Sequence, residues 1–408
     1  MSNAVAERLR PFGTTIFAEM TRLAVEHDAV NLSQGFPDFD GPAFIREAAK
    51  HAIDTGHNQY ARPAGEPALV GAIATSFSER TGLACDAMAE VTVTSGCTEA
   101  IAATMLGLVN PGDEVVLFEP FYDSYRACVA MAGAVPKTVA MRPARGSGGM
   151  RYAFDEAELR AAFGPKTRAV LVNTPHNPTG SVLTREELGV IASLATEHDA
   201  IVIADEVYEH LVYEGEHVSI AALPGMAERT VTLSSLGKTF SLTGWKIGWA
   251  IAPPQLTAGV RAAHQFLTFA VSTPMQHAAA EAIMRGQAEI DALLARYRDA
   301  RSMLAETLDR VGFDVIMPAG SYFIMAGHER VSERLGIAAH AEKMRQQHDV
   351  ALSLRLIRDV GVATIPPSVF CVRPEVASGS LRFAFCKKPE TLREAARRLE
   401  PLVRGGGS

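Results

Sequence analysis

The 408-residue chain lacks the features that mark several large classes of protein. Its five cysteines, Cys85, Cys97, Cys128, Cys371 and Cys386, form no Cys-x-x-Cys pair, which excludes a disulfide framework and fits a reducing compartment. The twelve histidines show no pair at helical metal-ligand spacing, so we expect no metal site. No run of about 18 uncharged apolar residues occurs, and no apolar core of signal-peptide length stands at the start, so we expect a cytoplasmic protein.

Positive charge is also scarce. The chain has 39 Lys and Arg against 46 Asp and Glu, a formal net charge of -7, without any long basic cluster. This balance argues against a nucleic-acid surface and against a DNA-binding regulator that senses a ligand, because no residues are spare for a basic module. The loop at 145–149 is rich in glycine, but no apolar strand leads into it. We interpret it as a surface turn, which disfavours a nicotinamide dehydrogenase.

What is present is an alternation of apolar strands and amphipathic stretches. The composition, 48% hydrophobic and 21% charged, is typical of a soluble globular protein, and the length suggests two or three domains. The alternation predicts a parallel sheet covered by helices on both faces. The expected strands lie near 91–94, 115–118, 168–173, 201–205, 231–234 and 247–252.

From about residue 284 the pattern changes to an α+β type. It predicts helices over 290–311 and 336–360, and extended segments at 313–317, 320–325, 362–365 and 380–385. The glycine-rich end, residues 404–408, is predicted to be a disordered tail.

One lysine stands in unusual surroundings. Lys238 follows the strand-like Thr230–Leu233 and lies among small, hydroxylated and glycine residues. An ordinary lysine amine, with a pKa of about 10.4, is protonated at neutral pH, whereas a desolvated amine beside other cations becomes a nucleophile that attacks carbonyls. The alternative is a surface lysine in a Gly/Ser turn, since Ser-x-x-Lys alone is a weak motif.

Three further segments place polar groups directly after expected strands. The apolar run at 201–205 ends on Asp205, where a carboxylate can face a ligand, although a helix N-cap is the alternative. Asn177 is followed by Pro178, which forces an extended backbone and a rigid loop. Gly96 lies between a strand and a helix, where backbone N–H groups can hold a phosphate, but such turns are common without a ligand.

Together these segments resemble the cofactor site of the class I aminotransferases, which are fold type I pyridoxal phosphate (PLP) enzymes. The resemblance covers about residues 9–402, and the chain is most similar to the branch of kynurenine, glutamine and methionine aminotransferases, with succinyl-diaminopimelate aminotransferases close by. Its most specific parts are Asn31–Asp40, Asn58–Tyr60, Glu119–Tyr125, Asn177–Gly180, Asp205–Tyr208, Ser234–Gly248 and Leu381–Phe385.

The resemblance implies an α/β fold in which a large, mainly parallel seven-stranded sheet binds PLP. The implied large domain spans 41–284, and a smaller α+β domain spans 285–403. The first 40 residues would pack with the small domain, which places the active site between the domains.

The resemblance also implies a role for each motif. Lys238 would bind PLP covalently and then move a proton at the substrate Cα, while Asp205 would keep the cofactor ring nitrogen protonated. Tyr208 would donate to the ring oxygen together with Asn177, the alternative for Tyr208 being a core tyrosine. Tyr122 would stack on the ring, unless it only fills core. The phosphate would be held by Gly96, Cys97, Thr98, Ser235 and Lys246, and Tyr60 would reach the phosphate of the neighbouring subunit of a homodimer.

Arg382 fits the substrate α-carboxylate, because a guanidinium binds a carboxylate bidentately and is costly to bury without an anion. The Gly35 backbone would lie nearby. The positions that match the side-chain pocket are Phe17, Phe36 and Phe269. Their aromatic character favours a neutral L-amino acid, aromatic, methionine, glutamine or kynurenine-like, whose amino group passes to a 2-oxo acid by a ping-pong mechanism.

Two alternatives use the same cofactor. A succinyl-diaminopimelate aminotransferase would require an added cation for its charged substrate. A β-lyase acting on cysteine conjugates would release pyruvate and ammonia without a 2-oxo acid.

Overall fold

The computed structural model describes residues 4–13, 15–146 and 148–404. Its large sheet has eight strands within these residues, in the order β2-β9-β8-β7-β6-β3-β4-β5. The neighbours from β8 through β4 are parallel, while β9 is antiparallel to both β8 and β2. The strands are β2 (Val91–Ser95), β3 (Glu114–Glu119), β4 (Val135–Gly146), β5 (Gly149–Phe154), β6 (Thr167–Asn173), β7 (Ile201–Asp205), β8 (Thr230–Ser235) and β9 (Ile247–Ile251). The fold is therefore the predicted α/β type with a mostly parallel sheet.

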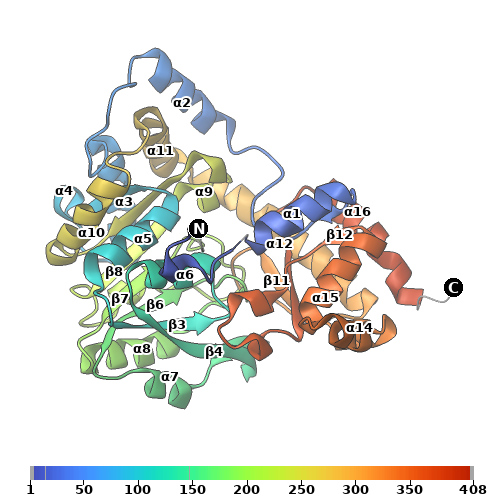
Figure 1. Cartoon of the computed structure of the whole chain (residues 1–408). Coiled ribbons are helices and arrows are strands. Elements are labelled where there is room, and N and C mark those ends of the chain that lie inside the picture. Colours follow the sequence, from blue (N-terminus) through green and yellow to red (C-terminus); the bar gives the residue numbers. More distant parts are fainter. Residues whose placement is uncertain (1–3, 14, 147, 405–408) are drawn as a thin grey trace.

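The central strands are buried on both faces, as continuous apolar runs predict. In β7, Ile201 and Ile203 pack on one face and Val202 and Ala204 on the other. The first face is covered by α5 (Gly96–Leu108), α6 (Asp123–Met131) and α10 (Pro254–Leu267), and the second by α7 (Glu156–Ala162) and α8 (Arg185–Glu197), which Figure 1 shows as the outer layers.

Six of these strands match the sequence prediction, but β4 and β5 were missed. β4 contains Pro136, Pro143 and three basic residues, so it presents no apolar run. Its first half pairs with β3 and its second half forms an antiparallel hairpin with β5. The glycine-rich loop interpreted as a surface turn connects this hairpin, and Ser147 lies outside the described residues. The hairpin strand β5 is thus an eighth strand beyond the seven expected.

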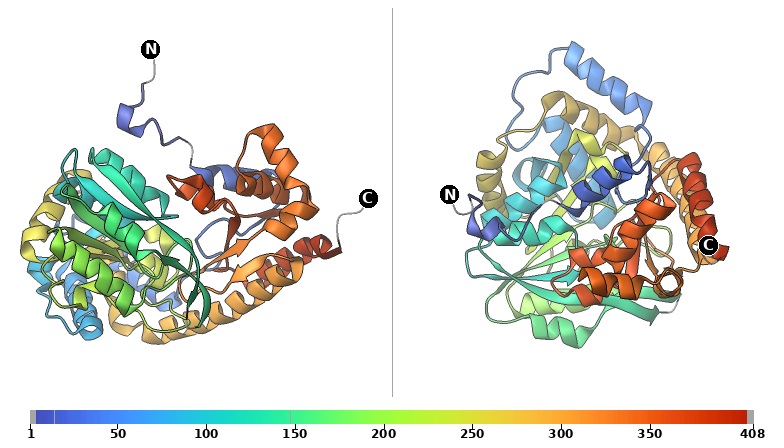
Figure 2. Two further views of the ribbon diagram at one scale, coloured as in Figure 1. Left: turned by 90° about the horizontal axis from the view of Figure 1, so that it is seen from below. Right: turned by 45° about the vertical axis from the view of Figure 1, so that its right-hand side comes forward.

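The C-terminal part of the chain builds a second, smaller set of strands. β10 (Asp314–Ile316), β11 (Phe323–Gly327) and β13 (Ser380–Ala384) form an antiparallel sheet, and β12 (Val362–Ala363) pairs in parallel with β1 (Val30–Asn31). The β1 pairing ties the N-terminal segment to this part of the chain (Figure 2). The domain boundaries near 40 and 284 stay a prediction.

The two helical regions predicted in the C-terminal part of the chain are present. Residues 336–360 form two α-helices and a final π-turn, and α12 contains the expected helix over 290–311. None of the helices in the described part of the chain combines the length and apolar character that a membrane crossing needs. Of the predicted tail, only Arg404 is described, at the end of a 3-10 turn. The helices are α1 (Ile16–Glu26), α2 (Ala43–Asp54), α3 (Pro67–Thr81), α4 (Ala87–Glu90), α9 (Leu236–Thr239), α11 (Thr273–Arg285), α12 (Gln287–Val311), α13 (Glu329–Arg334), α14 (Ile337–Met344), α15 (His348–Arg355) and α16 (Pro389–Leu399).

Candidate active site

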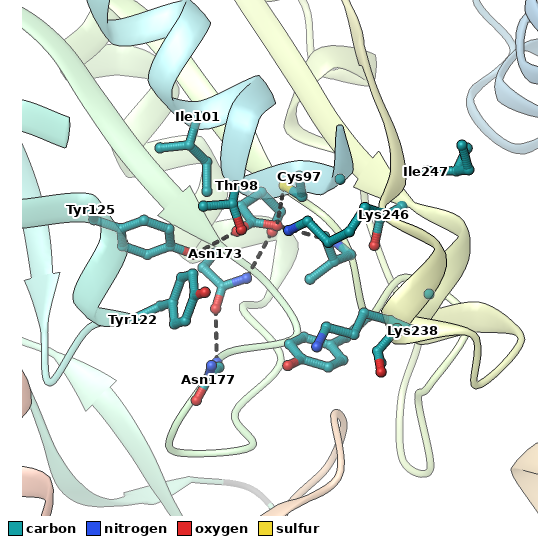
Figure 3. A pocket seen from close by; sticks show the side chains of 17 residues that line it. Cys97, Thr98, Ile101, Tyr122, Tyr125, Asn173, Asn177, Lys238, Lys246 and Ile247 are labelled. Atoms are coloured by element: carbon teal, nitrogen blue, oxygen red, sulfur yellow. Dashed lines mark hydrogen bonds between the residues drawn. The ribbon is translucent and has the colours of Figure 1, made fainter. Parts of the chain in front are cut away.

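A cavity of about 170 Å³ lies where the carboxyl ends of β6, β7 and β8 meet the start of α5 (Figure 3). Strand ends of neighbouring parallel strands converge at one sheet edge, which is where ligands bind in open α/β sheets. Ten of the eleven predicted cofactor residues line this cavity: Gly96, Cys97, Thr98, Tyr122, Asn177, Asp205, Tyr208, Ser235, Lys238 and Lys246. The eleventh, Tyr60, does not.

Lys238 projects into the cavity from the short helix α9, directly after β8. The side chain of Lys238 is partly exposed, because its amine faces the cavity. Burial lowers the pKa of Lys238 and the charge of Lys246 adds to this effect, while Asp205 opposes it. The Nζ atom lies 6.0 Å from the ring centroid of Tyr208 and 5.8 Å from that of Tyr322. The amine is therefore closer to its neutral, nucleophilic form than a solvated lysine.

Asp205 ends β7 and faces the same cavity, 3% exposed. Its Oδ2 accepts from the Tyr125 hydroxyl at 2.6 Å, and its Oδ1 accepts from the Val207 N–H at 3.3 Å and the Cys97 thiol at 3.6 Å. Burial raises the pKa of Asp205, and these three donors oppose the rise by stabilising the carboxylate. The carboxylate is thus held in one orientation at the base of the cavity.

Tyr125 was not predicted as a site residue. It was one of several aromatic residues between 118 and 125. The spacing from Tyr122 was an available signal, because residues three apart at a helix start face the same side. The two rings lie edge to face with centroids 5.7 Å apart.

Removing the Tyr125 hydroxyl gives a first test of this network. In Tyr125→Phe the carboxylate of Asp205 loses its shortest hydrogen bond, so its pKa rises further and the protonated form persists to higher pH. We expect kcat/KM to fall about tenfold and the acidic limb of its pH profile to move upward. Tyr152→Phe, whose hydroxyl contacts Ser380 instead, is the matched control. An unchanged acidic limb in Tyr125→Phe would show that the hydroxyl does not support the carboxylate.

The start of α5 at Gly96, together with the ammonium of Lys246, forms a positively polarised part of the cavity wall, called the cradle below. Gly96 begins α5 with φ +69, and a Cβ built there would lie 3.0 Å from Lys246 Nζ. A Cβ at Gly248 would approach the Cys97 nitrogen to 2.5 Å, so only glycine lets the two backbones lie this close. The N-terminus of a 13-residue helix beside a lysine ammonium is suited to an anion such as phosphate.

These three features match the three polar parts of PLP. The amine of Lys238 suits an aldehyde, the carboxylate of Asp205 suits a protonated ring nitrogen, and the cradle at Gly96 suits a phosphate. The side chains of Tyr122 and Tyr208 add aromatic walls. The residues present therefore fit this cofactor.

Arg382 lies on β13 and is 1% exposed. Its Nη1 donates to Asn177 Oδ1 at 3.0 Å and its Nη2 to the Ser33 carbonyl at 2.8 Å, whereas Nε has no partner among the described residues. Burial lowers the pKa of Arg382 to about 10. Because Asn177 Oδ1 is occupied by the guanidinium, its Nδ2 remains to donate into the cavity.

Aromatic rings surround the Arg382 guanidinium. Its Cζ lies 4.2 Å from the ring centroid of Phe323 and 5.4 Å from those of Phe17 and Phe370. The faces of these rings stabilise the cation without neutralising it. The guanidinium of Arg382 can therefore bind a carboxylate, and the Phe17 ring beside it can contact an apolar group.

The remaining predicted residues are Gly35, Phe36 and Phe269 of the substrate site and Tyr60 of the partner's phosphate site. The Gly35 carbonyl accepts from the Tyr322 hydroxyl at 2.5 Å, and a Cβ at this position would come within 2.7 Å of the Phe323 ring. Phe36, Phe269 and Tyr60 are exposed and line no part of the cavity, and the rings of Tyr60 and Phe269 contact each other edge to face. A single chain thus does not bring these three aromatic side chains to the cavity.

Within the described ranges of the chain, one group of residues outside the cavity has metal-ligand spacing, namely Glu206, Glu209 and His217. These three residues already form ion pairs and hydrogen bonds. Arg80 lies 2.8 Å from Glu209 Oε2, Ser234 donates to Glu209 Oε1, and His217 Nε2 lies 3.1 Å from Glu206 Oε2. We interpret the group as a buried ion-pair network.

The fold and this arrangement at the sheet edge define the class of fold type I PLP enzymes. Within that class, the chain belongs to the aminotransferases of class I and II, whose family model matches residues 27–399. The family is generally PLP-dependent, uses amino acids and 2-oxo acids, and is typically dimeric. The chain is therefore an aminotransferase.

Several relatives are similar over almost their whole length. A solved N-succinyldiaminopimelate aminotransferase from Mycobacterium tuberculosis has a TM-score of 0.91 and 47% identity, covering 98% of this chain and 100% of that one. The methionine aminotransferase of Escherichia coli is 39% identical over 97% of both chains. The human kynurenine–oxoglutarate transaminase 1 is 37% identical over 95% of both.

Proposed function

We propose that this aminotransferase binds PLP at the cavity and moves the amino group of a neutral, sizeable L-amino acid to a 2-oxo acid. Bound PLP supplies an aldehyde for amine exchange and a ring that accepts the electron pair left at Cα. Lys238 anchors the cofactor and, once its amine is released, carries the proton from the substrate Cα. Asp205 fixes the charge on the ring nitrogen. The cradle at Gly96 and Lys246 holds the phosphate.

The observation that carries the substrate proposal is the surroundings of Arg382. A buried guanidinium without an anionic partner is costly, and a substrate carboxylate removes that cost by forming a charge-assisted pair. Asn177 orients the guanidinium from the cavity side. The rings of Phe17 and Phe370, stacked 5.6 Å apart beside it, favour an apolar or aromatic substrate side chain.

The second candidate substrate is an N-succinylated diaminopimelate, which the similarity to the Mycobacterium tuberculosis enzyme favours. Its distal carboxylates call for a further cation. Arg126, which follows Tyr125 on α6, is a candidate to test; it does not line the cavity, and its Cζ lies 5.6 Å from the ring centroid of Phe12.

A panel of amino donors in single half-reactions separates the two candidates. The PLP-loaded protein is mixed with L-methionine, L-phenylalanine, L-glutamine, L-kynurenine or N-succinyl-LL-diaminopimelate, and conversion of the cofactor to its aminated form is followed by absorbance. We expect the neutral donors to react fastest. Faster conversion by the succinylated donor, lost in Arg126→Ala but kept for methionine, would select the second candidate.

The same assay, extended with a cysteine conjugate as a further donor, tests two other outcomes. Pyruvate and ammonia released from a cysteine conjugate without a 2-oxo acid would indicate a β-lyase. No cofactor spectrum with added PLP would overturn the proposed function.

We also propose a homodimer in which Tyr60 reaches the cofactor phosphate of the partner subunit. Its ring is 87% exposed in the single chain and packs only at its edge against Phe269, itself 44% exposed. Exposed aromatic residues of this kind are typical of an interface.

A further inference from the structure

A histidine outside the cavity connects two segments that the proposed function places at the cofactor phosphate. His264 lies on α10 and is 1% exposed. Its Nδ1 lies 2.6 Å from Glu99 Oε1 and its Nε2 lies 2.8 Å from the Pro63 carbonyl. Both ring nitrogens therefore face acceptors that belong to different parts of the chain.

The chemistry of these two partners fixes the protonation of the ring. A carbonyl only accepts, so Nε2 must carry a proton. The other oxygen of Glu99 accepts the Ser95 N–H, so this carboxylate also acts as an acceptor. The pair then satisfies every group as an imidazolium with a carboxylate, and removal of the proton between them would leave two lone pairs facing each other in a buried site.

Glu99 connects the ring to the cradle. It lies in the first turns of α5, and its bond to the Ser95 N–H closes the turn that presents Gly96. Pro63 belongs to the loop that carries Tyr60. The same loop is fixed again by Thr273, whose hydroxyl donates to the Gln59 carbonyl.

We propose that His264, with a proton on both ring nitrogens, is the positioning residue that holds the turn at Gly96 and the loop at Pro63 together for cofactor binding. The inference rests on the proposed function, because it assigns the turn at Gly96 to the cofactor phosphate. It adds a residue that touches neither cofactor nor substrate, and it makes PLP affinity depend on the charge of a buried histidine.

The charges around the ring give this dependence its sign. Burial alone would lower the pKa of His264, but the hydrogen bond and charge of Glu99, with the backbone of Pro63 and Phe269, outweigh burial and raise it. Arg261, on the same helix, is directed away to Thr92 and to the Met88 and Val91 carbonyls. The stabilising pair of His264 and Glu99 is complete below about pH 6.5, which is the ordinary pKa of a histidine. It is lost as the pH rises through the raised pKa of His264.

Three measurements on the full chain test the inference. The ¹⁵N shifts of the His264 ring, assigned by their absence in His264→Gln, should report both nitrogens protonated at pH 7. The dissociation constant for PLP should be about tenfold higher in His264→Gln. From pH 6 to pH 9, PLP affinity and the unfolding temperature of the cofactor-free protein should fall more in the parent than in the variant, because only the parent has this proton to lose.

The controls separate failure of this inference from failure of the proposed function. His27→Gln, at an exposed site, should match the parent. Glu99→Gln should reproduce the loss of pH dependence, and the ¹⁵N measurement on the parent requires no variant to fold. A neutral His264 ring at pH 7, or parallel pH profiles in parent and His264→Gln, would overturn the inference. A parent that binds no PLP would overturn the proposed function instead.

Discussion

Lys238→Ala is expected to lose essentially all transamination, with a fall in kcat/KM of at least about 10⁴-fold. The reason is that one amine has two tasks. Its lowered pKa makes it available as a nucleophile toward the cofactor aldehyde, and under the proposed function the same amine, in the cavity that Asp205 and Tyr208 also line, carries the proton at the substrate Cα. Among the residues that the structure describes, the only other lysine that lines this cavity is Lys246, which lies beside Gly96.

Covalent trapping measures the first task independently of turnover. Borohydride reduction of the PLP-loaded parent, followed by digestion and mass spectrometry, should place the label on the peptide with Lys238. Lys50→Ala removes an exposed lysine of α2 and should leave label and activity unchanged. The variant Lys238→Ala should keep its fold, because the amine fills no apolar core. Label on a different lysine of the parent, or turnover by the variant near the parental rate, would refute the assignment.

The grouping of the candidate cofactor residues around one cavity could be predicted from the sequence because these residues lie in short strand-turn segments. Asp205 ends a recognisable strand, Asn177 and Gly96 each follow one, and the strand ends of a mostly parallel sheet meet at one edge. The local sequence therefore predicts both the motif and its position at the edge of the sheet. The positions of six strands could be predicted from their apolar runs. The position of β4 could not, because its prolines and basic residues interrupt any apolar run.

The side chains that support these residues could not be predicted in this way. Tyr125 reaches Asp205 across 80 residues of sequence, and Tyr322 reaches Gly35 across 287. His264 reaches Glu99 across 165. Such pairs form only when helices pack on the sheet or when the C-terminal strands meet the N-terminal segment, and no local pattern in a single sequence records that packing.

The aromatic residues assigned to the substrate pocket and to the partner's cofactor phosphate show a different limit. Phe17 lies beside Arg382, but Phe36 and Phe269 of the predicted pocket, and Tyr60 of the predicted phosphate site, are on the surface of one chain. Under the proposed dimer, their place depends on the partner subunit. A sequence pattern identifies such residues by resemblance, while the contacts within one chain neither support nor oppose their role.

Replacing Arg382 by lysine or glutamine is expected to reduce kcat/KM for every amino acid by about 100-fold, mainly through KM. Lysine keeps the charge but cannot hold Asn177 Oδ1 and the Ser33 carbonyl while binding a carboxylate bidentately, so it should rescue little. Steady-state kinetics with an amino acid and with the matching amine, which lacks the carboxylate, measures the effect directly.

The unfolding temperature should respond to the replacement of Arg382 quite differently from kcat/KM. The Arg382 guanidinium is buried, its Nε has no partner within the described residues, and burial lowers its pKa, so the cation is held at a cost despite the three aromatic rings around it. We therefore expect Arg382→Gln to unfold within a few degrees of the parent when no substrate is bound, and PLP binding to be retained. A residue that only stabilised the fold would give the opposite result, with a large loss of unfolding temperature and an unchanged preference for amino acids over the matching amines. That result would remove Arg382 from the substrate site.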